Sequence, residues 1–182
     1  MPVIASNVED PRPEGERIPY LTYVGEDAYT VGVEMAKYLW NRAKSENFAI
    51  GKALVGIPDP THIGAVNRAQ GLIDTFGKLG VETIKVITGG EPTQVREVIQ
   101  STLMAHPDIN VIWIVALAVV PYVHDVLVEL GLEDEVWLAT VDESPLAIEG
   151  ILKGYIVATH SQQFWLQGFL PVMWLYIYLE YG

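Results

Sequence analysis

Between Gly51 and Gln162 the sequence alternates short apolar runs with longer amphipathic segments. Each apolar run ends in a corner that contains polar residues, glycine or proline, and each of the first four runs leads into a helical pattern. Strands that alternate with helices in this way form right-handed crossovers and a parallel sheet. The runs are Lys52–Ile57, Thr83–Thr88, Asn110–Ala116, Val136–Val141 and Tyr155–Thr159. The pattern predicts a doubly wound α/β domain whose ligands collect beyond the carboxyl ends of the strands.

Helical periodicity and end signals place the remaining elements. Two short extended runs, Pro2–Ala5 and Leu21–Gly25, flank a polar, proline-rich connector. Thr61 is the predicted N-cap of the second helix, and Ser144 followed by Pro145 predicts the start of the fifth. The predicted helices are Asp27–Ser45, Thr61–Leu79, a segment from Pro92 that stops before Pro107, Pro121–Leu130, Leu146–Leu152 and Phe164–Tyr181. A length of 182 residues suits one domain rather than two.

Charge and composition exclude several kinds of function. The formal net charge is −12, from 11 basic and 23 acidic residues, which opposes binding to nucleic acid or to anionic membranes. The chain has no cysteine, so it forms no disulfide and has no thiolate metal site. The four histidines show no metal-binding spacing, and we predict neither a metal nor a cofactor. Residues Met1–Ala5 lack the pattern of a signal peptide, so the chain as written is expected to stay in the cytoplasm where it is expressed.

The most apolar segment is Phe164–Tyr181, which is about as long as one membrane span. Gln167, Gly168, Pro171 and Glu180 interrupt it, so we interpret it as a buried or interface helix rather than a span. A helix that is apolar all round must be covered on more than one side. We therefore predict a homodimer that buries this helix, since exposed patches of this size usually mark association.

Several phrases of the sequence, in this order and spacing, resemble the type I periplasmic sugar-binding proteins, the group that contains ribose-binding proteins and the effector domains of LacI-type repressors. The resemblance implies two flavodoxin-like lobes that are joined by three crossovers and enclose a sugar. The chain looks like the C-terminal lobe, with a crossover strand and linker at residues 1–20 and a crossover helix at residues 163–182. The phrases are YVGEDAYTVG (Tyr23–Gly32), NRAQGLIDTF (Asn67–Phe76), AHPDINVIW (Ala105–Trp113), ATVDESPLAIEGILKG (Ala139–Gly154) and ATHSQQFWLQG (Ala158–Gly168).

This resemblance implies a fold and a function. The fold is a flavodoxin-like α/β domain with five parallel strands in the order 2-1-3-4-5 and helices on both faces. The function is that of a non-enzymatic solute-binding lobe of an ABC-type sugar uptake system, periplasmic or extracellular in the parent protein. Because the N-terminal lobe looks absent, we expect sugar binding to be weak or lost.

The resemblance also implies which residues contact the sugar. They are Asn67 or Arg68, Asp142 at the end of a strand, and Gln162 in the last crossover. A carboxylate accepts hydrogen bonds from two hydroxyls, while guanidinium and amide groups donate in fixed geometry. Two other interpretations stay open: Arg68 pairs with Asp74 or Glu82 on the surface, and Gln162 satisfies backbone groups of the crossover. The corners add the candidates His62, Glu91 and His160.

Two corners depart from the family pattern. Residues Ile114–Val120 are apolar where polar residues are expected, and Ser161 and Phe164 flank the Gln-Gln pair in place of Asp and Pro. These departures favour a surface that packs on protein, or an engineered, self-assembling scaffold without a small-molecule ligand. A further alternative is a small enzyme that uses Asp142, Glu143 and His160. Neighbouring residues of an extended run point to opposite sides, which opposes a hydrogen bond between Ser161 and His160 in a catalytic triad. We therefore predict that the protein is not an enzyme.

Overall fold

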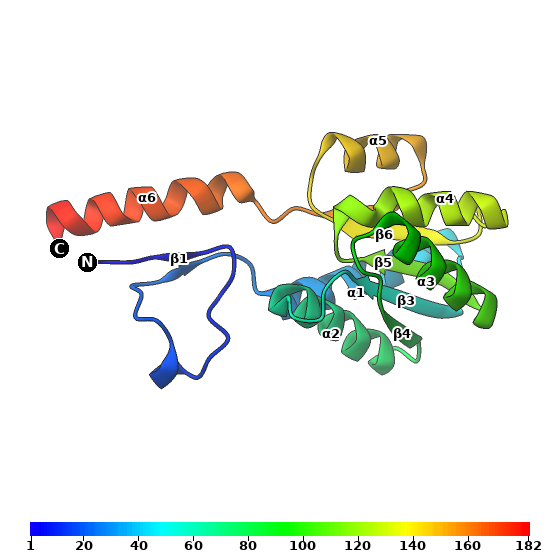
Figure 1. Ribbon diagram of the computed structural model, residues 1–182, viewed down its shortest axis with the longest axis horizontal. Helices are drawn as coiled ribbons and strands as arrows, with labels where there is room; N and C mark the ends of the chain where they lie inside the picture. Colours follow the sequence, from blue (N-terminus) through cyan, green and yellow to red (C-terminus); the bar gives the residue numbers. More distant parts are fainter. The chain divides into compact units, whose positions relative to one another are not determined.

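The computed structural model describes residues 1–182, whose contacts group them into two compact units. The sheet unit comprises Ala28–His160 (Figure 1). The terminal unit comprises Met1–Asp27 together with Ser161–Gly182. Whether these units fold as one domain over residues 1–182 stays a prediction, and each unit is described here by itself.

The sheet unit contains one five-stranded sheet in which every strand pair is parallel. Along the sheet the strands lie in the order β4-β3-β5-β6-β7, which is 2-1-3-4-5 when the five are numbered along the chain. The predicted flavodoxin-like topology is therefore confirmed. The strands are β3 (Lys52–Ile57), β4 (Glu82–Ile87), β5 (Ile109–Ile114), β6 (Trp137–Val141) and β7 (Ala158–His160).

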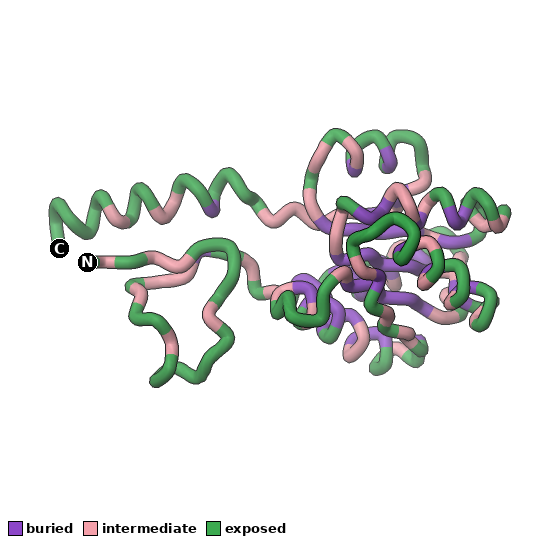
Figure 2. The backbone as a smooth tube through the Cα atoms, in the orientation of Figure 1, coloured by how far each residue is buried: buried purple, intermediate pink, exposed green.

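Helices cover both faces of this sheet. Alternate strand residues pack into two separate apolar cores, one against α1 and α2 and the other against α3 and α4. Figure 2 shows the buried residues concentrated along the strands and the inner sides of these helices. Burial on both faces explains why the strands read as continuous apolar runs. The helices are α1 (Ala28–Glu46), α2 (Ile63–Lys78), α3 (Pro92–Ala105), α4 (Val120–Leu130) and α5 (Pro145–Lys153).

Most helix ends follow the sequence signals. Ser144 Oγ accepts a hydrogen bond from the amide of Ala147 at 3.2 Å, as expected of an N-cap. Gly131 and Gly154 end α4 and α5 in the left-handed conformation, with φ of 67° and 87°. The predicted cap of α2 is wrong, because His62 rather than Thr61 occupies this position. Thr61 is instead engaged by Asp59, whose carboxylate accepts from both its amide and its hydroxyl at 2.7 Å.

The apolar corner after β5 folds back into the core. A short 3-10 helix, η2 (Leu117–Val119), continues directly into α4. Val115, Val119 and Val120 are all buried. Val119 and Val120 belong to the apolar core on the α3/α4 face. Their apolar character is thus explained within the sheet unit itself, and no external protein surface is needed to account for them.

Two glycines let α1 and α2 approach to backbone contact. A Cβ on Gly32 would lie 1.9 Å from the carbonyl oxygen of Arg68, and one on Gly71 would lie 2.1 Å from that of Tyr29. No side chain fits at such distances, so glycine is required at both positions. The contact fixes α2, and with it the backbone of Arg68, against α1.

The terminal unit joins the two ends of the chain. β1 (Ala5–Ser6) pairs in parallel with β2 (Tyr23–Val24), and α6 spans Phe164–Tyr181. Gln167 is the one buried residue of α6. Its backbone carbonyl accepts from Ser6 Oγ at 2.9 Å, its side-chain oxygen accepts from Asn7 Nδ2 at 3.0 Å, and its Nε2 donates to the carbonyl of Gln162 at 2.5 Å. Gln167 therefore joins α6 to the β1 segment and to the residues that precede the helix. None of the helices, α6 included, has the length and apolarity needed to cross a membrane.

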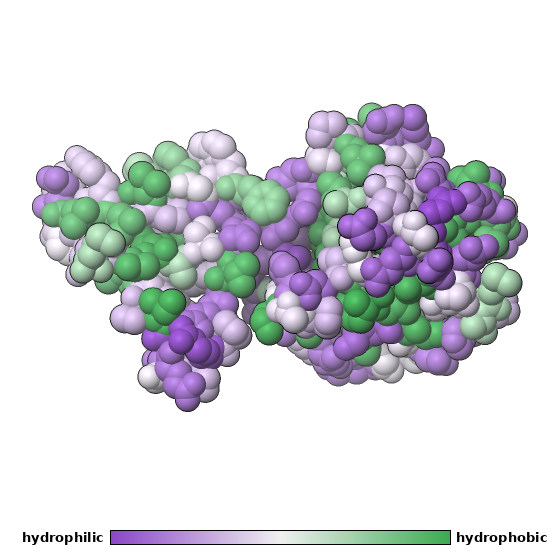
Figure 3. Space-filling model, viewed as in Figure 1, coloured by the Kyte–Doolittle hydropathy of each residue, from purple (hydrophilic) through white to green (hydrophobic).

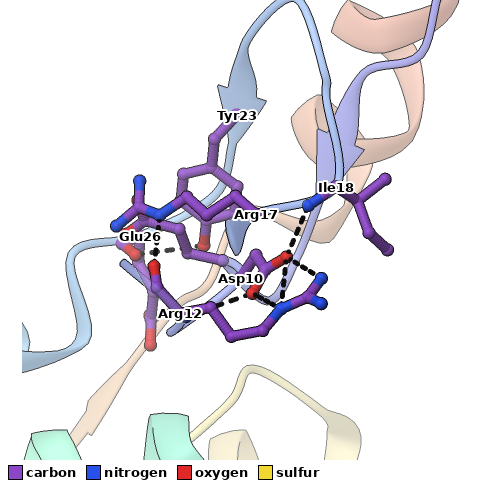
Figure 4. A network of polar contacts seen from close by, with 7 residues as sticks. Asp10, Arg12, Arg17, Ile18, Tyr23 and Glu26 are labelled. Atoms are coloured by element: carbon purple, nitrogen blue, oxygen red, sulfur yellow. Dashed lines mark hydrogen bonds and ion pairs between the residues drawn. The ribbon is translucent and has the colours of Figure 1, made fainter. Parts of the chain in front are cut away.

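Charged side chains order the proline-rich connector of this unit (Figure 4). The Asp10 carboxylate accepts from Arg12 Nη2 at 2.5 Å and from the amide of Ile18 at 3.0 Å. These bonds, first those from the Arg12 side chain, hold the pKa of Asp10 well below its usual range. Arg17 then donates to the carbonyl of Arg12 at 2.7 Å, so the loop is closed by its own residues. A 3-10 turn, η1 (Glu14–Glu16), lies within it.

The glycine contact between α1 and α2 yields a paired stability prediction. Gly71→Ala is expected to lower the free energy of unfolding by about 3 kcal/mol, because its Cβ would overlap the Tyr29 carbonyl. Gly77→Ala lies in the same helix with nothing within 4 Å of the new Cβ, and it should raise this free energy by about 0.5–1 kcal/mol. Urea unfolding followed by circular dichroism measures both. Equal effects of the two substitutions would contradict the backbone contact.

Candidate ligand-binding site

The carboxyl ends of the five parallel strands form one edge of the sheet, and the predicted site residues of the sheet unit follow this edge. His62 comes after β3, Glu91 after β4 and Asp142 after β6, while His160 ends β7. Asn67 and Arg68 lie one turn into α2, the helix that leaves β3. Because β3 and β5 are neighbours whose connections lead to opposite faces, this edge contains the topological switch point where α/β folds bind ligands.

Asp142 has the most unusual backbone of these residues. Its φ is +72°, in the left-handed region that Asp and Asn tolerate better than other non-glycine residues. Its amide donates to the carbonyl of His160 at 2.6 Å, and its own carbonyl accepts from Thr159 Oγ1 at 2.7 Å. The structure thus brings Asp142 and His160 together, as predicted from neighbouring strands. Asp142 is half-buried and directly follows the last residue of β6.

The opposite side of β6 is fixed by buried groups of β5. Thr140 Oγ1 donates to the carbonyl of Ile114 at 3.0 Å, and Trp113 Nε1 donates to the carbonyl of Thr140 at 3.1 Å. All three residues are completely buried. Thr140, Trp113 and Thr159 are not among the residues predicted from the sequence. The sequence does contain one signal for Thr140: it is the penultimate residue of an apolar strand, and a buried hydroxyl requires a hydrogen-bond partner.

Asn67 and Arg68 are neighbours on α2 with different environments. Asn67 is exposed, whereas Arg68 is only 6% exposed. The surface location expected for an Arg68 ion pair is wrong, because this residue is buried. The two carboxylates considered for it have other partners: Asp74 accepts from Tyr29 and Gln70, and Glu82 pairs with Lys52. A buried guanidinium requires polar partners, which is consistent with a functional or structural role at this edge.

His62 and Glu91 both occupy helix N-termini. His62 Nδ1 accepts a hydrogen bond from the amide of Ala65 at 3.0 Å, so this imidazole caps α2. Glu91 is the N-cap residue of α3, but its carboxylate makes no capping hydrogen bond and its side chain is exposed. His62 thus has a structural task that competes with ligand contact. Glu91 contributes negative charge beside the start of a helix, where the macrodipole favours it.

Gln162 and Ser161 belong to the terminal unit. The backbone carbonyl of Gln162 accepts from Gln167, and Ser161 Oγ accepts from the amide and Nε2 of Gln163 at 3.1 and 3.0 Å. The segment then turns at Gln163, whose φ is 56°, before α6 begins. Ser161 therefore stabilises the turn that precedes α6.

A groove of about 460 Å³ runs beside the edge strand of the sheet unit. Its size suits a small ligand. Among the predicted site residues only His160 lines it, and the groove adjoins the Asp142 corner through Thr159 and His160, which both hydrogen-bond Asp142. The lining comes from α1, α5, β7 and the residue before β7: Val31, Glu34, Met35, Tyr38, Arg42, Ile151, Val157, Ala158, Thr159 and His160.

A five-stranded parallel sheet in this order, with helices on both faces, is a doubly wound α/β fold whose polar corners lie at its carboxyl edge. The chain belongs to the family described as periplasmic binding protein domain, whose model matches residues 1–182. The resemblance expected from the sequence phrases is confirmed.

Comparison with individual proteins gives the same class. The chain is 29% identical over 167 residues to the xylose/arabinose-binding protein XylF of Sulfolobus acidocaldarius, covering 88% of this chain and 40% of XylF. It superposes with a TM-score of 0.87 on a periplasmic sugar-binding protein from Legionella pneumophila, at 23% identity, over 100% of this chain and 65% of that one. For GanP, a glucose-galactose binding protein from Geobacillus stearothermophilus, the TM-score is 0.83 at 20% identity, over 98% of this chain and 61% of GanP. The chain thus spans less than half the length of the curated relative.

Proposed function

We propose that this chain binds a sugar as part of the solute-binding component of an ABC-type uptake system, and that it is not an enzyme. The observation that carries the proposal is the Asp142 corner, where a residue with a carboxylate side chain has a left-handed backbone conformation at the carboxyl edge of the sheet. The family match over residues 1–182 supports it. So do the sugar-binding relatives. The family description and the periplasmic protein from Legionella pneumophila lead us to propose a periplasmic or extracellular site of action.

Each site residue has a proposed role that follows from its chemistry. The Asp142 carboxylate accepts hydrogen bonds from two sugar hydroxyls, and Arg68 donates to the sugar with its planar guanidinium. Asn67 and Gln162 supply amide groups that both donate and accept. His62, Glu91 and His160 contact the sugar from the surrounding corners.

Affinity is proposed to be weak when residues 1–182 are studied alone. Small-molecule sites enclose 70–90% of the ligand surface, and enclosure contributes much of the binding free energy. The part of XylF outside the match, about 60% of its length, has no counterpart in these residues. We propose that residues 1–20 and 163–182 serve as crossover segments that lead to this second wall.

Replacement of Asp142 tests the sugar site. Asp142→Asn keeps the size of the side chain and its tolerance of the left-handed conformation, but it removes the charge. Affinity for the best sugar in a panel of xylose, arabinose, ribose, glucose and galactose should fall about 10- to 100-fold in isothermal titration calorimetry, because hydrogen bonds to charged groups are the strong ones. The matched control is Glu149→Gln, which removes an exposed carboxylate paired with Lys153 on α5 and should leave affinity unchanged.

Failure to bind any sugar of the panel at millimolar concentrations would contradict the proposal and favour the scaffold alternative. Equal losses in Asp142→Asn and Glu149→Gln would show that net charge, rather than the Asp142 corner, governs binding.

We also propose that residues 1–182 associate as a homodimer through α6. Apart from Gln167, its side chains are at least partly exposed, and many of them are large and apolar (Figure 3). Burial of such a surface contributes about 25 cal/mol per Å² before the costs of association. The exposed members are Phe164, Trp165, Leu166, Phe169, Val172, Met173, Trp174, Tyr176, Ile177, Tyr178, Leu179 and Tyr181.

Charge substitutions on α6 test this association. Val172 and Leu179 are 68% and 67% exposed, so Val172→Glu with Leu179→Glu should leave the helix folded but shift sedimentation from dimer to monomer. Leu152→Glu is the matched control, because Leu152 is 81% exposed on α5 and should not change the mass. A stable monomer of the unsubstituted chain at micromolar concentration would overturn the proposal.

A further inference from the structure

The geometry points to Thr159 as a positioning residue that holds Asp142 in the conformation required for sugar contact, an inference that rests on the proposed function. Thr159 lies on β7, next to the last residue of that strand. Its side chain acts on the ligand through Asp142, whose carbonyl oxygen accepts its hydroxyl proton at 2.7 Å.

Two consecutive residues of β7 hydrogen-bond the backbone amide and carbonyl groups of Asp142. Thr159 Oγ1 binds the Asp142 carbonyl, and the His160 carbonyl accepts the Asp142 amide at 2.6 Å. The regular pairing of β6 with β7 ends one residue earlier, where Val141 pairs with His160. Asp142 is therefore the first residue beyond the last strand pair: its amide makes the final ladder bond to the His160 carbonyl, and the Thr159 side chain adds a contact to its own carbonyl oxygen.

The left-handed conformation of Asp142 requires support from neighbouring groups. A non-glycine residue at φ +72° occupies a sparsely populated region and persists there when the surrounding structure determines it. A return to negative φ would turn the Cα–Cβ bond and carry the carboxylate away from its present direction. The Thr159 hydroxyl opposes this change because it fixes the peptide group on the C-terminal side of Asp142.

The role differs from that of the other threonine near this corner. Thr140 Oγ1 is completely buried and satisfies the carbonyl of Ile114 inside the sheet, so its loss would affect folding as a whole. Thr159 is half-buried at the edge, and its bond joins the strand end to the residue proposed to bind the sugar. Removing this hydroxyl should therefore change affinity more than stability.

The test compares Thr159→Val with Thr159→Ser in the full 182-residue chain, using the best-bound sugar of the panel. Thr159→Val keeps the shape but lacks the hydroxyl, and its affinity should be about 3- to 10-fold lower, the loss expected for one neutral hydrogen bond. Thr159→Ser retains the donor and should bind within about 2-fold of the unsubstituted chain. In an Asp142→Asn background, Thr159→Val should cause a smaller loss than it does alone, because both act on one contact.

A second measurement, amide hydrogen exchange, reports on the Asp142 corner in the absence of a ligand. In Thr159→Val, the Asp142 amide should exchange with solvent faster, whereas amides in the centre of β6 should be unchanged. Equal affinity and equal Asp142 exchange in Thr159→Val and the unsubstituted chain would overturn the positioning role while leaving sugar binding intact. No binding by the unsubstituted chain would overturn the proposed function and this inference together. An equal loss in Thr159→Val and Thr159→Ser would also overturn it, since packing would then be the cause.

Discussion

Burial of both faces of the five-stranded sheet decides where this protein can place polar chemistry. With α1 and α2 on one face and α3 and α4 on the other, strand side chains face apolar cores on both sides. A polar group in such a strand is unfavourable unless it is hydrogen-bonded. Polar side chains able to meet a ligand are therefore confined to the strand ends and to the connections and helices that follow them, and the parallel arrangement brings the carboxyl ends to one edge.

Threonine hydroxyls connect the buried sheet to that edge. Thr140 satisfies the Ile114 carbonyl within the core, and Thr159 satisfies the Asp142 carbonyl just beyond it. β6 is thus held from both neighbouring strands at the point where the chain enters the left-handed conformation of Asp142. The proposed sugar contact depends on this rigidity, because a preorganised carboxylate loses less entropy when it binds.

Much of this architecture could be predicted from the sequence. The apolar runs located the five strands of the main sheet, although β7 begins later than predicted, and β3 and α6 have the predicted bounds. The cap of α2 could not be predicted. Thr61 is hydrogen-bonded to Asp59, and His62 caps the helix instead, which depends on side-chain geometry that the sequence does not show. The apolar corner after β5 was misread because hydrophobicity alone does not say which core it enters. The roles of Thr159 and Gly71 were equally hidden, since both depend on which residues face each other across separate elements.

The placement of the sugar at the carboxyl edge can be measured residue by residue. Xylose or arabinose would be titrated into the ¹⁵N-labelled chain, and amide shifts would be followed by NMR. The proposed site predicts that the largest changes fall on Asp142 and its neighbours, on Asn67 and Arg68, and on His160 and Gln162. Shifts confined to the groove lined by Glu34, Tyr38 and Arg42, or to α6, would contradict the site at the sheet edge.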